Sequence, residues 1–181
     1  MVFQVVVFHT RTPPLFIAYQ LVRIPGSTSD DSDRKLLSDV DTYGWHMVAI
    51  EKEDNCQEYI FTVGLYYSFE HPEIAIMGLP RDVMYQFLQD VVHQIQKGKR
   101  YSTSALDHDL ASFPIAFRDI DISRYCDYLG YAVWFYKNLA APFPALQFVW
   151  PDKEGLFPWE EDYDNRFLAL QHLLYTEKHE S

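Results

Sequence analysis

Residues 61–80 are FTVGLYYSFEHPEIAIMGLP, in which two apolar runs are joined by the corner His71, Pro72 and Glu73. Apolar runs of this length, bounded by turn residues, are typical of strands in a core. The second run, EIAIMGLP, is short and almost wholly apolar, so we expect it to be covered on both faces. A corner between two buried strands is also a place where side chains gather into pockets.

The residues before this stretch predict a hairpin. Residues 45–51, WHMVAIE, have the apolar content of a strand, and a short helical pattern that starts at Leu36 ends just before them, at Gly44. Residues 58–69, EYIFTVGLYYSF, follow the turn residues DNCQ and form the second strand. We therefore expect these two strands to pair in an antiparallel hairpin.

Residues 81–98, RDVMYQFLQDVVHQIQKG, have the clearest helical pattern in the chain. Their apolar residues recur with the period of a helix, and polar residues occupy the opposite face. Pro80 suits the first turn, Asp82 complements the positive end of the helix dipole, and Gly98 suits the C-terminal cap. The sequence predicts one long amphipathic helix here.

The later segments complete an α+β pattern. Residues 114–125 alternate apolar and polar side chains as in a strand, and residues 126–138 predict a helix that Gly130 weakens. Residues 145–152 predict a strand that ends at a proline, and residues 166–175 predict a last helical turn or two. We expect a single α+β domain with a mostly antiparallel sheet, the long amphipathic helix packed on it, and a second C-terminal helix.

Residues 1–35 differ in composition from the rest of the chain. The runs VFQVVVF and LFIAYQLVRI predict two strands that can form a hairpin, and PGSTSDDSDRK has the composition of a polar linker. We therefore divide the chain into an extension, residues 1–35, and an α+β domain, residues 36–181. The hairpin could add an edge to the sheet or form a homodimer contact.

The composition restricts the class of partner and the compartment. A formal net charge of -11 repels phosphate backbones, so we expect no nucleic acid partner, but it can steer a protein with a basic surface. Two cysteines are too few for a disulfide framework and favour a cytoplasmic setting. We identify no signal peptide, and no apolar run reaches the roughly 20 residues that a membrane span needs, so we expect a soluble protein with no membrane partner.

The corner is the first candidate for chemistry. In an extended segment His71 and Glu73 point to the same side, where they could form an acid–base pair, and Asp152 is a further catalytic candidate. We favour a simpler interpretation, in which Pro72 stiffens a tight turn and the polar groups of His71 and Glu73 bond exposed backbone. In this interpretation Asp152 closes the turn PDKEG.

Motifs for metal binding and nucleophilic catalysis are absent from the sequence. Neither H-E-x-x-H nor a paired-cysteine spacing occurs, and the trio Asp107, His108 and Asp109 is more typical of a solvated turn, so we predict no metal. A G-x-S-x-G elbow does not occur, and neither cysteine lies in a recognisable catalytic signature.

A second group of residues are candidates for binding a ligand. Lys99 and Arg100 lie in the stretch KGKRYSTS, which could hold a phosphate, although positive residues also complement a helix C-terminus. The aromatic stretch LQFVWPDKEGLFPW could line a groove or simply cover the core. The other candidates are Thr62, Gly64, Gln147, Trp150 and Trp159. We predict no cofactor, with a flavin as the open alternative.

Several motifs follow one another in a fixed order: YGWHMVAIEKED, FTVGLYYSFEHPEIAIMGLP, the helix that ends in QKGKRY, and LQFVWPDKEGLFPW. Together they resemble a bacterial family known as domain of unknown function 4262. The resemblance covers residues 36–159, with Phe61 where the family often has Tyr and Ile74 where it often has Leu. It implies no established activity for this chain.

Two functions therefore remain open. The first is a non-enzymatic module that binds another protein with a basic surface, as an accessory or immunity-like factor. The negative charge, the aromatic motifs and the lack of a catalytic signature favour it. The alternative is a small-molecule enzyme, or a binder of a flavin or a phosphorylated ligand, with its pocket near His71, Pro72 and Glu73.

Overall fold

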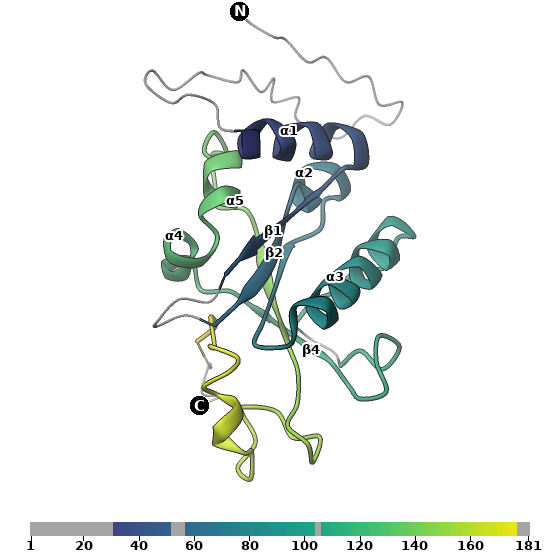
Figure 1. The fold of residues 1–181 in the computed structure, drawn as a ribbon, viewed down its shortest axis with the longest axis vertical. Helices are drawn as coiled ribbons and strands as arrows, with labels where there is room; N and C mark the ends of the chain where they lie inside the picture. Colours follow the sequence, from purple (N-terminus) through teal and green to yellow (C-terminus); the bar gives the residue numbers. More distant parts are fainter. Residues whose placement is uncertain (1–30, 52–56, 104–105, 177–181) are drawn as a thin grey trace, which may run out of the picture.

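The computed structural model describes residues 31–51, 57–103 and 106–176, and Figure 1 shows a single sheet with helices around it. The predicted hairpin in residues 1–24 and most of the turn DNCQ lie outside the described residues. The elements are, in chain order, α1 (Asp31–Tyr43), β1 (His46–Ile50), β2 (Tyr59–Val63), α2 (Leu65–Phe69), β3 (Glu73–Met77), α3 (Arg81–Gln96), β4 (Ala116–Asp119), α4 (Tyr125–Tyr128), α5 (Gly130–Phe135) and β5 (Ala145–Val149).

The sheet has five strands in the order β1-β2-β3-β5-β4. Three neighbouring pairs are antiparallel, and only β3 and β5 are parallel. The predicted hairpin of β1 and β2 is confirmed, with His46 opposite Val63 and Ile50 opposite Tyr59. Parallel strands need a long crossover connection, and here the chain between β3 and β5 supplies α3, β4, α4 and α5.

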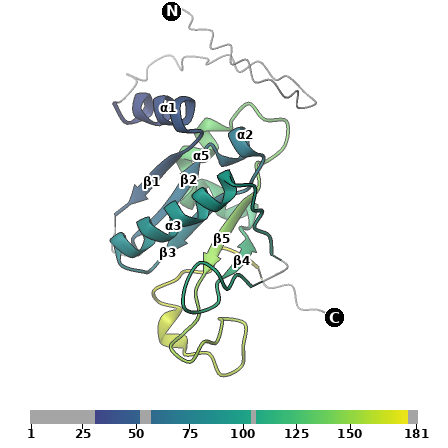
Figure 2. The ribbon, with the colours of Figure 1, turned by 90° about the vertical axis from the view of Figure 1, so that its right-hand side faces the viewer.

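The long amphipathic helix is confirmed as α3, which crosses one face of the sheet (Figure 2). Its buried side chains pack in one cluster with Ile60 of β2 and with Ile74 and Ile76 of β3. Pro80 precedes the first turn, and Gly98 follows the last one with a φ of 99°. The apolar stripe of this helix therefore faces the sheet, as its period predicts.

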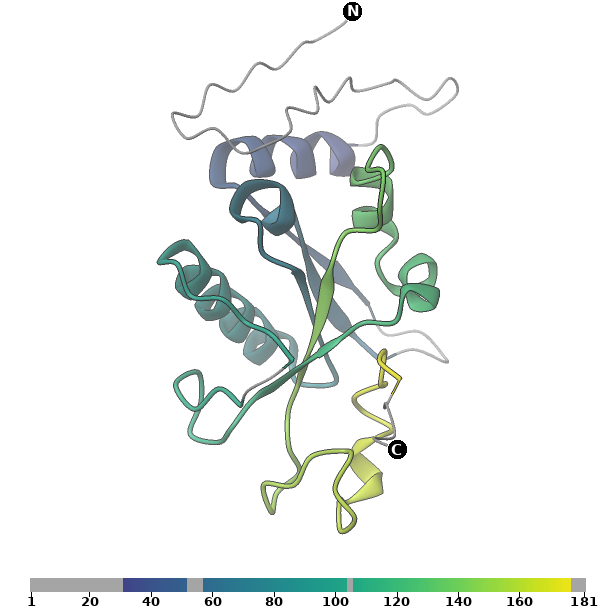
Figure 3. The same cartoon turned by 180° about the vertical axis from the view of Figure 1, so that it is seen from behind.

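The opposite face of the sheet is covered by α1, α4 and α5. In Figure 3 the teal α3 and the green α4 and α5 lie on opposite sides of the strands. Leu36 and Val40 of α1 pack in the same cluster as Phe61 of β2 and Ala132 of α5. The strand β3 is buried at all five positions because both of its faces are covered, as expected.

Helix α1 begins at Asp31, so residues 31–35, which the composition predicts to belong to a linker, are helical. Asp31 and Asp33 lie in the first turn, where negative side chains complement the helix dipole. The helical pattern that starts at Leu36 is therefore the buried part of a longer helix, and Leu36 and Val40 anchor that helix on the sheet.

The prediction that the second strand of the hairpin continues to Phe69 is wrong. The strand ends at Val63, and residues 65–69 form the short helix α2. Gly64 has a φ of 106°, a conformation that L side chains rarely adopt, and a Cβ there would lie 2.9 Å from a methyl group of Val40. A glycine is therefore required where the chain turns from β2 into α2.

Three predicted elements are shorter in the structure. The strand expected over residues 114–125 covers only Ala116–Asp119, and Ile122 lies beyond it in a single 3-10 turn, 62% exposed. The helix expected over residues 126–138 is divided into α4 and α5 just before Gly130. The last helical turns expected over residues 166–175 amount to a 3-10 turn at Asn165–Phe167.

None of the helices in residues 31–51, 57–103 and 106–176 is long and apolar enough to cross a membrane.

Candidate functional site

The corner that precedes β3 holds His71 in a buried position with both ring nitrogens engaged. Nε2 accepts a hydrogen bond from the backbone N–H of Tyr101 (3.0 Å), and Nδ1 donates to the carbonyl of Pro72 (2.8 Å). Burial lowers the pKa of His71 and nearby Arg100 adds to this effect, although the bond to Pro72 opposes it. His71 is therefore a neutral side chain that ties the corner to the segment after α3.

Glu73, the first residue of β3, is fully buried and is surrounded by hydrogen-bond donors. Its carboxylate accepts bonds from Thr62 Oγ1 (2.6 Å), Tyr136 Oη (2.5 Å), the N–H of Gly64 (3.0 Å) and the N–H of Tyr66 (3.1 Å). Burial raises the pKa of Glu73, and the four hydrogen bonds oppose that rise. The carboxylate thus joins the end of β2, the start of α2 and the end of α5.

The structure gives His71 and Glu73 separate sets of partners. Tyr101, which contacts His71, belongs to the cluster under α3, whereas Tyr136, which contacts Glu73, belongs to the cluster under α1, α4 and α5. The alternation rule does not apply to this pair, because β3 begins only at Glu73. Thr62 and Gly64, predicted as ligand-binding residues, are brought to Glu73 instead. No sequence signal pointed to Tyr136.

Gln147 holds residues 172–174 against the sheet, and Trp150 binds the neighbouring strand β3. The amide of Gln147 donates to the carbonyl of His172 (2.8 Å) and accepts from the N–H of Leu174 (2.8 Å). The indole N–H of Trp150 donates to the carbonyl of Met77 in β3 (3.0 Å). Both side chains are buried, and their polar atoms serve internal contacts.

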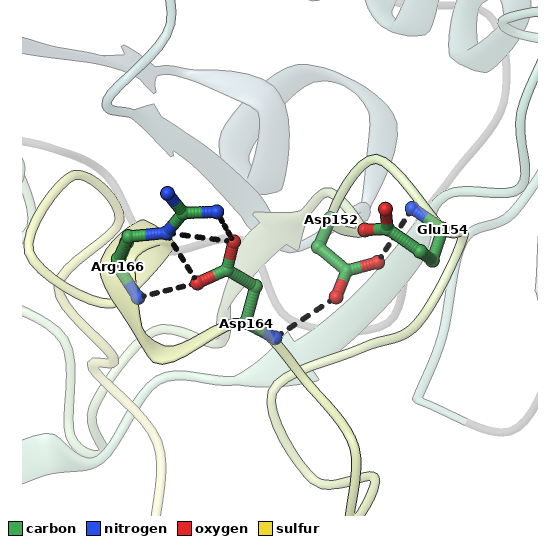
Figure 4. Close-up of polar contacts among 4 residues, drawn as sticks. All are labelled: Asp152, Glu154, Asp164 and Arg166. Carbon is green, nitrogen blue, oxygen red and sulfur yellow. Dashed lines mark hydrogen bonds and ion pairs between the residues drawn. The ribbon is translucent and has the colours of Figure 1, made fainter.

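Asp152 organises the loop after β5, as Figure 4 shows. Its carboxylate accepts hydrogen bonds from the N–H groups of Glu154 (3.0 Å), Leu156 (2.8 Å) and Asp164 (2.9 Å). Burial opposes ionisation, but these bonds outweigh it and lower the pKa of Asp152. The prediction that Asp152 closes the turn PDKEG is confirmed.

Trp159 packs in the same loop against the outer strand β4. Its ring stacks on Phe157 at a centroid distance of 4.8 Å, and the guanidinium of Arg118 lies 3.7 Å from its centroid. A cation held over an indole is a favourable contact that fixes both side chains. Trp159 is thus part of the cover of the sheet edge.

The basic stretch after α3 is also engaged within the chain. Lys99 forms an ion pair with Asp107 and lies 3.5 Å from Asp109, and Arg100 donates to the carbonyl of Phe69 (2.9 Å). Asp107 also accepts bonds from the N–H groups of Asp109 and Leu110. Residues 107–109 therefore form a turn. Lys99, which was a candidate for binding phosphate, instead balances the negative charges of Asp107 and Asp109.

A surface depression of about 500 Å³ lies elsewhere, between α1, β1 and α3, and we call it the α1–α3 groove. It is lined by Asp39, Tyr43, Trp45, His46, Met47, Gln89 and Gln96. Tyr43 is 63% exposed, and Trp45 and Met47 are half-buried. Aromatic and apolar side chains with a few polar groups are typical of recognition surfaces. The sequence analysis did not identify this groove.

Hydrogen bonds to Asp39 form part of the wall of the α1–α3 groove. Asp39 Oδ2 lies 2.7 Å from His46 Nδ1 and 2.7 Å from Lys35 Nζ. Burial opposes ionisation of Asp39, but hydrogen bonds from Lys35 and His46 prevail and lower its pKa. A carboxylate bonded to one ring nitrogen fixes the orientation of a histidine and leaves its other nitrogen for a partner or ligand. Asp39 lies in a helix and His46 lies in a strand seven positions later, and this spacing matches no recognised motif. The pair therefore becomes visible only in the tertiary structure.

In the part of the chain that the structure describes, no three His, Cys, Asp or Glu side chains gather as they would around a metal ion.

One family model matches the chain over residues 39–164, and its description is Domain of unknown function (DUF4262). The matched range contains all five strands of the sheet and every residue that lines the α1–α3 groove. The resemblance predicted from the ordered motifs is thus confirmed. No curated protein and no solved structure matches the chain.

Proposed function

The chain belongs to the DUF4262 family, and for this member we propose a non-enzymatic function: it binds another protein that presents a basic surface. The partner docks in the α1–α3 groove. The observation that carries the proposal is the contrast between this open aromatic groove and the predicted catalytic side chains, which are engaged in internal hydrogen bonds.

The engagement of the catalytic candidates argues against chemistry at the corner. His71 uses both ring nitrogens for backbone groups, and Glu73 accepts four bonds that hold β2, α2 and α5 together. A substrate would have to displace these contacts and leave buried donors unsatisfied, at about 1–3 kcal/mol for each. The side chains of the corner therefore serve stability.

The groove has the features of a protein-docking surface. Tyr43 and Trp45 are of the residue types that contribute most binding energy in interfaces, and Gln89 and Gln96 add hydrogen-bonding groups without charge. The net charge of -11 steers a basic partner towards the molecule. We place this accessory or immunity-like function in the cytoplasm, which two isolated cysteines favour.

The test is capture of partners from a lysate of the source cells on the immobilised full chain. We expect the native chain to retain a protein with a basic surface, and to retain less of it as salt is raised, because exposed charges are screened. Tyr43→Ala should reduce retention about tenfold, as expected when an interface anchor is lost. Ile122→Ala is the matched control, because Ile122 is equally exposed (62% against 63%) but lies in the 3-10 turn before α4.

Two results would contradict the proposal. The first is that no protein is retained even at low salt. The second is that Tyr43→Ala and Ile122→Ala retain the same amount of the same protein.

A small-molecule ligand is the second candidate, and the Asp39–His46 pair favours it. A groove of about 500 Å³ lies within the usual size range of ligand sites, and an oriented histidine in its wall supplies a hydrogen-bonding group. A flavin or a phosphorylated compound remains the ligand class to test. Visible absorbance of the purified chain, or a rise in its melting temperature with such a compound that His46→Ala abolishes, would support this candidate over the first.

A further inference from the structure

Among the residues that the structure describes, strand β1 has an open edge. It pairs with β2 on one side and ends the strand order of the sheet, and no strand among the described residues lies on its other side (Figure 2). Proteins protect such edges with lysine, proline or a bulge. β1 reads HMVAI, which contains neither lysine nor proline, and its five pairs with β2 run without interruption. An apolar edge of this kind calls for a cover.

The α1–α3 groove adjoins this edge and also exposes apolar surface. Three side chains that line the groove lie close together in the chain. Trp45 immediately precedes β1, Met47 is the second residue of β1, and the exposed ring of Tyr43 lies at the end of α1. In the described part of the chain, the free edge and the groove therefore form one continuous surface that suits an extended apolar segment.

Residues 15–24 of the chain, LFIAYQLVRI, have the composition that fits this surface. Eight of the ten residues are apolar or aromatic, and the segment predicts a strand. Its charge also fits, because residues 1–24 contain two arginines and no acidic residue, so that all 26 acidic residues of the chain lie after them. Opposite charges favour contact between the two parts of the chain.

The connection to the domain is long enough for this contact. Only residues 25–30 separate the segment from Asp31, and six extended residues span about 20 Å. Helix α1 has 13 residues, which makes it about 20 Å long, and β1 starts shortly after its end. A segment that runs back along α1 therefore reaches β1, and a tether this short makes its local concentration high.

We propose that residues 15–24 lie along the free edge of β1 and cover the α1–α3 groove, so that they compete with the protein partner for one surface. The competition rests on the proposed function, whereas the docking of the segment does not. The partner then has to resemble the segment, with an extended apolar stretch and a basic residue.

The test is amide hydrogen exchange of β1 in the full-length chain without any partner. Alternate N–H groups of an edge strand point away from its neighbour and exchange quickly unless a further strand covers them. We expect these β1 amides to exchange about tenfold more slowly in the native chain than in the double variant Ile17→Pro/Leu21→Pro, since proline cannot pair within a strand. Ser29→Pro, in the connection, is the control and should leave the exchange unchanged.

A second measurement and a second variant distinguish loss of docking from unfolding of the domain by the introduced prolines. Oxidative footprinting of Trp45 should increase in the double variant, while Trp159, which is also half-buried but lies in the loop after β5, should not change. Arg23→Glu should raise the exchange of the β1 amides more than Arg11→Glu, because only Arg23 lies in the docking segment. Unchanged amides in β3 would show that the domain remains folded.

Equal exchange and equal Trp45 oxidation in the native chain and the double variant would overturn the proposal. Protection that disappears on dilution together with a dimeric mass would also overturn it, because a second copy would then be the cover. Both results are independent of lysate capture, which tests the proposed function. If both ideas hold, the double variant should capture more partner than the native chain.

Discussion

Glu73 and Asp39 are both carboxylates with several hydrogen-bond partners, but their surroundings differ. Glu73 is fully buried, and its four donors are neutral hydroxyl and backbone groups from three elements of the fold. Asp39 is 20% exposed in the wall of the α1–α3 groove, and its partners are the side chains of Lys35 and His46. The carboxylate of Glu73 makes all its hydrogen bonds inside the fold, whereas the carboxylate of Asp39 lies at a surface that a partner can contact.

The largest effect is expected at Glu73. Glu73→Ala removes the acceptor of the Thr62 and Tyr136 hydroxyls and of the Tyr66 N–H, while the Gly64 N–H keeps a second acceptor in Tyr136 Oη (3.2 Å). The free energy of unfolding should therefore fall by about 4 kcal/mol. Urea denaturation measures this change. Glu73→Gln keeps one acceptor oxygen and should cost less, about 2 kcal/mol. A loss below about 1 kcal/mol for Glu73→Ala would show that the network does not hold the fold, and the comparison would fail.

A smaller effect is expected from the titration of His71. Its folded pKa is lowered from the ordinary value of 6.5, so the unfolded chain binds more protons below that pH. The free energy of unfolding should therefore fall as the pH drops below 6.5, by about 1.4 kcal/mol for each unit of pKa shift, and this contribution should be constant above that pH.

The control for the titration is His71→Gln, which has no group that titrates in this range. Denaturation measured at several pH values should show a shallower acid slope for the variant than for the native chain. Identical slopes would mean that His71 is not the buried neutral group described above.

The smallest effect on stability is expected at Asp39. Asp39→Asn removes the negative charge that pairs with Lys35 near the surface, where such pairs contribute little, so the free energy of unfolding should change by less than about 1 kcal/mol. The same substitution should nevertheless reduce retention of the basic partner, because it removes a negative charge from the groove. If Asp39→Asn greatly lowers the free energy of unfolding but leaves retention of the basic partner unchanged, Asp39 serves stability as Glu73 does, and the contrast between the two carboxylates is wrong.

Much of the fold could be predicted from local patterns. The helix α3, the hairpin of β1 and β2, and the buried strands β3 and β5 all follow from hydrophobic period, length and turn residues. The prediction failed at α2, because Gly64 interrupts an apolar run whose residues have no clear helical preference. The predicted strand over residues 114–125 also failed at Ile122, which is exposed, because the apolar character of a residue does not show whether other elements pack against it.

The candidate site was predicted only in part. His71 and Glu73 were identified at the corner, and Thr62 and Gly64 were named separately as ligand-binding candidates. Glu73, Thr62 and Gly64 do meet, but the donor Tyr136 comes from 63 residues away along the chain. A hydrogen-bond partner so distant in the chain is not marked by any motif of fixed spacing in the sequence. The groove was missed for the same reason, because its wall combines α1, β1 and the outer face of α3.

The sequence by itself determined the elements of this protein, its charge and its family, because these depend on the order of residues over short distances. The tertiary structure alone decided which polar side chains are enclosed and which remain at a surface. Burial arises when separate elements pack together, and the energy of a carboxylate depends on its neighbours in space far more than on its neighbours in the chain.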